Sequence, residues 1–226
     1  MLKGLILKDF YRIRFQMILA FAVMLFPNML FGPVFVEMFG SFDVNDTHLG
    51  AVLVSILINY ISIILCSLFI SNNTDDNIKS GWSKIQLTMP LSAGEIIGGG
   101  LISSGLALAL TAVFIIFCNL VCIILFGLPI EPMITGPVIL ALLQMIPLSV
   151  SVVSGYFLGS LKSALMYTAI TIITAFGLGG IVACIARGSI TLTAARLIGY
   201  AGVPVLSAAV IVLCFSVGKK AVTKEV

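Results

Sequence analysis

Charged residues are scarce in this chain of 226 residues, which contains 12 Lys and Arg, 9 Asp and Glu and one histidine. They make up 9% of the sequence, against about a quarter in an ordinary soluble domain. Hydrophobic residues make up 60%, and the mean hydropathy is +1.22. This composition excludes a soluble enzyme and a disordered tail, because both need far more polar surface.

The charged residues are unevenly distributed along the chain and are confined to short stretches. Six segments of 22 to 35 residues contain no Asp, Glu, Lys or Arg. A bilayer core about 30 Å thick needs roughly 20 apolar residues per helix, so each segment is long enough to cross it. The sequence therefore predicts an all-α membrane protein, a single transmembrane domain of six transmembrane helices at 16–36, 49–71, 98–126, 137–159, 163–186 and 200–218.

The positions of the basic residues predict the orientation of these helices. With six spans, ten of the twelve Lys and Arg residues fall on one side of the membrane, and only Arg187 and Arg196 fall on the other. Short basic loops stay in the cytoplasm, so we expect both termini of this multi-pass chain to be cytoplasmic.

Several kinds of chemistry are missing from the predicted spans. None carries an Asp, Glu, Lys, Arg or His near its middle, which argues against a self-powered proton relay but leaves sodium binding at broken helices open. The one histidine, His48, lies at the end of a span, and the five cysteines lie in apolar runs, so no metal site is expected. No G-x-x-x-x-G-K-[ST] loop is present, so the chain is not expected to be an ATP-hydrolysing enzyme.

Neutral polar residues remain at membrane depth, and any of them could line a substrate path. Each could equally make an interhelical hydrogen bond, worth about 0.6 kcal/mol on average, and taken singly that is the simpler interpretation. The possible pathway residues are Asn59, Tyr60, Asn119, Gln144 and Tyr167.

The N-terminal residues 1–15 predict a short helix that lies in the membrane interface. Apolar side chains recur every three or four residues, and basic side chains occupy another face. Such a helix can lie among the headgroups and attract anionic membrane lipid, although a frayed basic cap on the first span is an alternative. The residues expected to define it are Lys8, Asp9, Phe10 and Arg12.

Two further segments are neither spans nor simple turns. Residues 72–97 form the longest cytoplasmic segment, with a polar run, a short amphipathic stretch and a break at Pro90. Residues 187–199 are too apolar for a free loop, so we expect an outer re-entrant or interfacial segment before the sixth span. Its Arg187 and Arg196 would then extend to the headgroups.

Two stretches carry a resemblance to a known family. One is the N-terminal MLKGLILKDFYRIR, and the other lies within 75–97. The second combines an acidic pair, a Gly-Trp, a short helix, a Pro turn and a final Glu-Ile-Ile: Asp75, Asp76, Gly81, Trp82, Met89, Pro90, Leu91, Ser92, Glu95, Ile96 and Ile97. With the topology, these stretches resemble the small permease subunits of ABC-2 type transporters. The chain departs from them at 93–94 and 98–100, where Ala and Gly replace commonly basic residues.

The resemblance implies the permease half of an ATP-driven exporter in a bacterial cytoplasmic (plasma) membrane. Its partners would be a separate ABC ATPase subunit, which binds ATP and Mg, and a second permease copy or a sister permease in a homo- or heterodimer. No cofactor in this chain and no nucleic acid are implied. The subgroup that exports phenol-soluble modulins suggests an amphipathic or hydrophobic cargo, such as a peptide toxin, an antimicrobial peptide or a drug.

The resemblance also assigns residues 72–97 as the segment that couples the permease to the ATPase. Trp82 would be an apolar anchor there, although a membrane-interface residue is an equal interpretation. The implied coupling residues are Asp75, Asp76, Lys79, Trp82, Lys84, Met89, Pro90, Leu91 and Glu95. A stand-alone secondary carrier and a non-transporting assembly or immunity protein remain the alternatives.

Overall fold

The computed structural model describes residues 3–12, 14, 17–18, 21–22, 47–80, 86, 88, 91–126, 130–186 and 191–225. These residues are helical almost throughout and include no strand, which confirms the all-α prediction for this part of the chain. Most of the predicted first span, 16–36, lies outside them.

The helices are long, as a chain with few internal breaks predicts. After the N-terminal helix of residues 3–12, the described elements are α2 (Thr47–Lys79), α4 (Ala93–Phe126), α5 (Ile130–Leu158), α6 (Ser160–Ala186), α7 (Leu192–Leu197), the π-helical turn η1 (Ile198–Gly202) and α8 (Val203–Glu225).

Four described stretches are long and apolar enough to cross a membrane: Ala93–Val121, Met133–Leu158, Leu161–Ile181 and Ile198–Lys220. The apolar part of α2 is shorter, from Ile56 to Asn72. The described part of the chain is therefore that of a helical membrane protein with four such helices.

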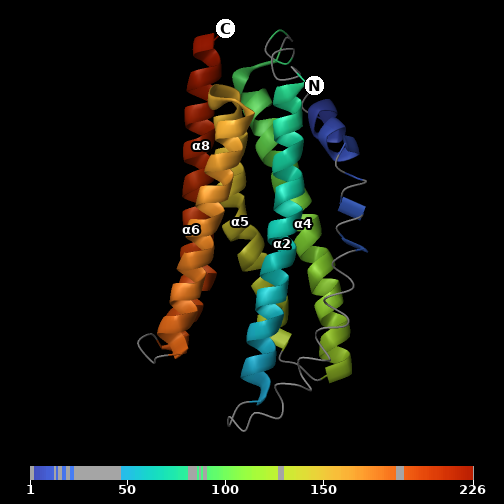
Figure 1. The fold of residues 1–226 in the computed structure, drawn as a ribbon, viewed down its shortest axis with the longest axis vertical. Coiled ribbons are helices and arrows are strands. Elements are labelled where there is room, and N and C mark those ends of the chain that lie inside the picture. The colour runs from blue at the N-terminus through green and yellow to red at the C-terminus, as the bar shows by residue number, and fades with distance from the viewer. Residues whose placement is uncertain are drawn as a thin grey trace.

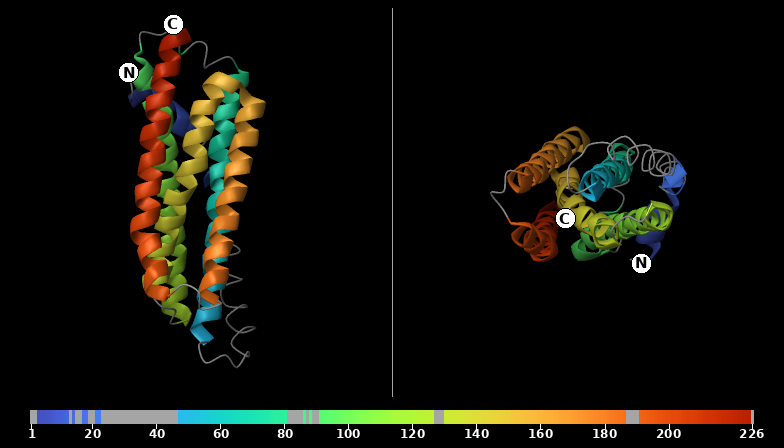
Figure 2. Two further views of the ribbon diagram at one scale, coloured as in Figure 1. Left: turned by 90° about the vertical axis from the view of Figure 1, so that its left-hand side faces the viewer. Right: turned by 90° about the horizontal axis from the view of Figure 1, so that it is seen from below.

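The helices lie side by side in an elongated bundle around α5. Figure 1 shows the N-terminal helix, the end of α2, the start of α4, the turn between α5 and α6 and the C-terminus at one end, here called the upper end. Helix α5 contacts α2, α4, α6 and α8, and it lies between them when the bundle is seen along its axis (Figure 2). Of its apolar stretch 78% is buried, against 11% for α6 and 17% for α8, so these two helices present apolar side chains outward.

A proline within α5 explains one buried contact between helices. Pro137 has no N–H, so the Met133 carbonyl one turn earlier loses its helical hydrogen bond. The Asn119 side chain, on α4, donates to that carbonyl through Nδ2 at 2.7 Å, and both residues are buried. Asn119 therefore replaces the donor that Pro137 lacks.

The last helix begins earlier than the sequence predicts. Residues 192–225 are helical without interruption through α7, η1 and α8. The Val203 N–H bonds to the Ile198 carbonyl, and this wide π-helical turn comes directly before Pro204, whose ring would crowd a regular turn. Residues 192–199 are thus helical and continuous with α8, the stretch able to cross a membrane begins at Ile198, and residues 187–190 lie outside the described residues.

The segment predicted at 72–97 also contains more helix than expected. Helix α2 continues to Lys79 and α4 begins at Ala93, so both neighbouring spans reach into it. Only residues 80–92 separate the two helices, and we call them the linker.

We expect Asn119→Leu to lower the free energy of unfolding by about 1 kcal/mol, because the Met133 carbonyl would lose its donor. Pro137→Ala restores a backbone N–H at that position. Asn119→Leu should therefore cost less in a Pro137→Ala background than in the native chain. Chemical unfolding of the four proteins in detergent measures this coupling, and equal costs in both backgrounds would contradict it.

Candidate functional site

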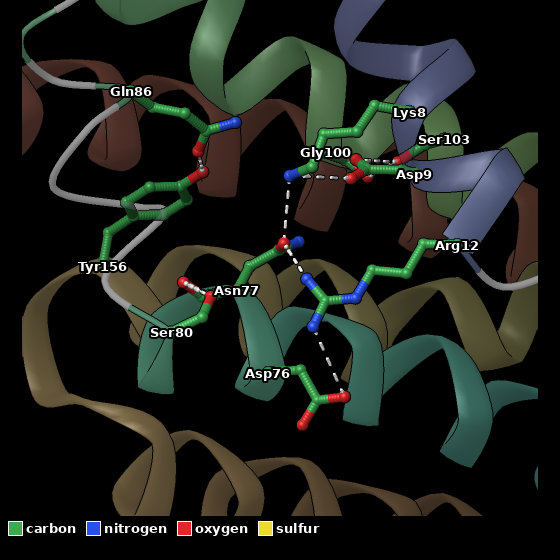
Figure 3. A network of polar contacts seen from close by, with 10 residues as sticks. All are labelled: Lys8, Asp9, Arg12, Asp76, Asn77, Ser80, Gln86, Gly100, Ser103 and Tyr156. Carbon is green, nitrogen blue, oxygen red and sulfur yellow. Dashed lines mark hydrogen bonds and ion pairs between the residues drawn. The ribbon is translucent and has the colours of Figure 1, made fainter.

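A group of polar side chains joins the N-terminal helix to the end of α2 (Figure 3). Lys8 Nζ donates to Asn77 Oδ1 at 3.0 Å, and a guanidinium nitrogen of Arg12 donates to the same oxygen at 2.7 Å. The other terminal nitrogen of Arg12 lies 3.7 Å from an Asp76 carboxylate oxygen. Two cationic donors on one amide oxygen make this a charge-assisted contact between segments 65 to 69 residues apart.

The same helix is also tied to α4. The Ser103 hydroxyl lies 3.3 Å from Asp9 Oδ2 and 3.0 Å from the Gly100 carbonyl, and Asp9 lies 3.9 Å from Lys8 Nζ. The Phe10 side chain packs against the main apolar core. We call Lys8, Asp9, Arg12, Asp76, Asn77 and Ser103 the polar joint, because they connect three segments of the chain at the upper end.

Burial dominates the electrostatics of the polar joint. The Asp9 side chain is only 14% exposed, and burial raises the pKa of its carboxyl group although Lys8 acts in the opposite direction. Burial likewise lowers the pKa of Lys8 to about 8; Asp9 opposes this change and Arg12 adds to it. The charged groups of Lys8 and Asp9 are thus held where water is partly excluded, whereas Arg12 and Asp76 are exposed.

Ser92 and Glu95 start α4 as a reciprocal cap. The Glu95 N–H donates to Ser92 Oγ at 3.2 Å, while a Glu95 carboxylate oxygen accepts from the Ser92 N–H at 2.9 Å and from its hydroxyl at 3.0 Å. This is a capping box, for which Ser-x-x-Glu before an apolar run is the sequence signal. Glu95, predicted for ATPase coupling, therefore has an intrachain role that the Ser-Ala-Gly-Glu pattern could have indicated.

The linker is attached to the central helix. The Tyr156 hydroxyl, near the end of α5, donates to Gln86 Oε1 at 3.1 Å, and Gln86 is buried (Figure 3). Leu91 packs against an apolar cluster formed by α4, α5 and α8. Gln86 carries no charge and belongs to no motif, so sequence reasoning missed it.

Of the remaining predicted coupling residues, some lie on α2 and the others lie outside the described residues. Asp76 and Lys79 are exposed in the last turns of α2, and Asp75 belongs to the same helix. Trp82, Lys84, Met89 and Pro90 lie outside the described residues.

The five predicted pathway residues do not form one group. Asn119 is bonded to Met133, and the Tyr167 hydroxyl on α6 is hydrogen-bonded to the Ser67 hydroxyl on α2. Tyr60 is buried in the same apolar core as Tyr167. These contacts hold helices together.

Asn59 and Gln144 differ from Asn119 and Tyr167. They are 0% and 1% exposed, and neither amide meets a hydrogen-bonding partner in the described part of the chain; the buried Tyr60 hydroxyl meets none there either. Buried amides without partners are uncommon in proteins, so these two need an explanation.

The opposite, lower end of the bundle has an exposed polar contact of its own. A terminal nitrogen of Arg196 lies 3.4 Å from Glu131 Oε2, and the Tyr200 hydroxyl donates to Glu131 Oε1 at 2.8 Å. Arg196 thus pairs with an acidic residue at the start of α5, where the sequence predicted contact with headgroups; Arg187 lies outside the described residues. Among the residues that the structure describes, no cluster of His, Cys, Asp or Glu could hold a metal ion.

Lys8 is expected to lose its proton near pH 8, because burial destabilises its ammonium form. Between about pH 8 and the ordinary value near 10.5, the unfolded chain would hold a proton that the folded chain has released, so stability should rise with pH there. Competitive acetylation followed by mass spectrometry measures the Lys8 titration, with an added short lysine peptide as internal reference. Identical pH profiles for Lys8 and the peptide would contradict the prediction.

The comparisons with known proteins give no family: no family model matches the chain, and no curated protein or solved structure is significantly similar to it.

Proposed function

We propose that this chain is the permease subunit of an ATP-driven ABC exporter, which moves an amphipathic or hydrophobic cargo out of a bacterial cell with the help of separate ATPase subunits. In this proposal the chain crosses the membrane six times, with 16–36 as its first span, and the upper end faces the cytoplasm. The observation that supports it best is the polar joint, because it links the N-terminal helix to the two helices that border the linker.

The contacts at the upper end offer a route for a mechanical signal. An ATPase that pushes on the linker would move α2 through its last turn and α4 through its capped first turn. The hydrogen bond between Tyr156 and Gln86 would carry the same motion to α5, which contacts four other helices. A bundle joined in this way can switch between two packings as rigid bodies.

The energy source in this proposal is another chain. ATP and Mg would bind to the ATPase partner, and a second permease copy or a sister permease would complete the pathway. The outward-facing apolar side chains of α6 and α8 suit contact with lipid or with that second permease.

A stand-alone secondary carrier is the second candidate, and one observation favours it. Pro147 cannot donate to the Leu143 carbonyl, and this missing hydrogen bond within the continuous helix α5 lies close in sequence to the Gln144 amide, which meets no partner among the described residues. Neutral oxygens at a broken helix are the ligands with which some carriers bind sodium.

The ATPase partner provides the first test. We expect the full chain, purified gently from its own membrane, to carry an ATPase subunit with it and to raise the turnover of that subunit in lipid. Trp82→Ala and Pro90→Ala should weaken the association, because they alter the linker. Retention of the ATPase by both variants would refute the assigned contact, and transport by the chain alone in ATPase-free vesicles would refute the whole proposal.

The polar joint provides the second test. Asn77→Ala removes the acceptor shared by Lys8 and Arg12, so we expect the ATPase to stay bound while cargo transport per ATP falls severalfold. Asn72→Ala, at an exposed asparagine on the same helix, is the matched control and should leave the ratio unchanged. Equal ratios in both variants and the native chain would show that the joint only stabilises the fold.

A further inference from the structure

Two contacts define how α2 and α5 lie against each other. A Cβ atom built on Gly136 would lie 3.9 Å from Ile56 Cγ1, and the hydroxyls of Ser71 and Ser151 are 3.2 Å apart. In both pairs the α5 residue number is 80 higher than the α2 residue number. Because this difference is the same at both contacts, the two helices run in the same direction, and each α2 residue lies level with the α5 residue 80 positions later.

This register places the two unpaired amides near each other in the bundle interior. Gln144 lies level with Ile64, five residues beyond Asn59 on α2. At a rise of about 1.5 Å per residue, the two side chains originate about 7.5 Å apart along the bundle, on helices that touch. Both residues are fully buried.

The chemistry around the pair restricts what it could bind. No Asp, Glu, Lys or Arg occurs between residues 47 and 74 of α2 or between 132 and 158 of α5. The nearby core is apolar and includes Ile63, Leu140 and Leu148. A charged ligand would have no counter-charge there, so the site suits a neutral group that both donates and accepts hydrogen bonds.

We propose that Asn59 and Gln144 form a site between α2 and α5 for the backbone amides of an uncharged, extended peptide segment. A carboxamide presents a donor and an acceptor side by side, which complements a peptide group. Amides on one side of an extended peptide recur every second residue, about 6.6 Å apart, which is close to the offset of about 7.5 Å between the two residues along the bundle. The inference rests on the proposed function only in taking such a segment to be cargo.

Occupation of the site requires α2 and α5 to separate, because both amides are fully buried in the structure. The unpaired amides favour that separation: in the closed packing they meet no partner within the described part of the chain, and they gain partners when a peptide enters. The closed packing is thus less stable than one in which these positions were apolar.

The binding test uses the full chain in lipid nanodiscs without any ATPase. The probe is N-acetyl-Leu-Leu-Leu-amide, and its comparator is the same peptide with every backbone nitrogen methylated, which removes the backbone amide donors. We expect the probe to raise the thermal unfolding midpoint in a saturable manner and the methylated peptide to bind at least tenfold more weakly. This comparison needs no variant of the protein.

Variants locate the site. Asn59→Leu and Gln144→Met should each raise the unfolding midpoint without peptide, because an unpaired buried amide is removed, and should weaken probe binding at least tenfold. Asn119→Leu is the matched control: it removes an amide that has a partner, so it should lower the midpoint and keep probe binding.

Equal binding of the two peptides, or unchanged binding in both amide variants, would overturn the proposal. An absence of any shift in the native chain would also overturn it and would leave water as the partner of the amides. Because no ATPase is present, the result is independent of the co-purification test, and each proposal can fail while the other stands.

Discussion

A polar group inside an apolar helix bundle has no bulk water to bond with, and much of this structure depends on how each such group is satisfied. The Met133 carbonyl, deprived of its helical donor by Pro137, is satisfied by Asn119 on the neighbouring helix. The hydroxyls of Ser71, Ser151 and Ser163 bond to one another where α2, α5 and α6 meet. These short side chains let the helices approach closely, so α5 can contact four others.

At the two ends of the bundle, by contrast, charged side chains make the contacts between helices. At the upper end, Arg12 and Lys8 converge on Asn77, and this joins an N-terminal helix to a helix that begins some 40 residues later. At the lower end, Arg196 and Tyr200 hold Glu131 at the start of α5. The polar joint is the more buried of the two, and its lowered Lys8 pKa reflects that burial.

Hydropathy predicted the helical class and the apolar segments, but apolar segments do not show where the helices themselves end. The predicted span ended at residue 71, where Asn72 opens a polar run, and the helix continues to Lys79. A polar side chain marks where a helix leaves the apolar layer and does not by itself end the helix. Residues 192–199 show the same effect at the lower end: they belong to a segment expected at the membrane interface or re-entrant, and their helix is continuous with α8. The Ser92–Glu95 cap was readable from local spacing alone, because its partners are three residues apart.

The sequence by itself determined that the chain is a helical membrane protein and that neutral side chains carry whatever polarity exists at depth. Composition and the length of apolar runs suffice for this, since both depend on local properties of the chain. Only the tertiary structure decided what each polar residue does. Asn59 and Asn119 are the same residue type in similar apolar surroundings, yet Asn119 is bonded and Asn59 meets no partner among the residues that the structure describes. The difference arises because hydrogen bonds need atoms within about 3 Å, and helix packing alone brings particular partners that close.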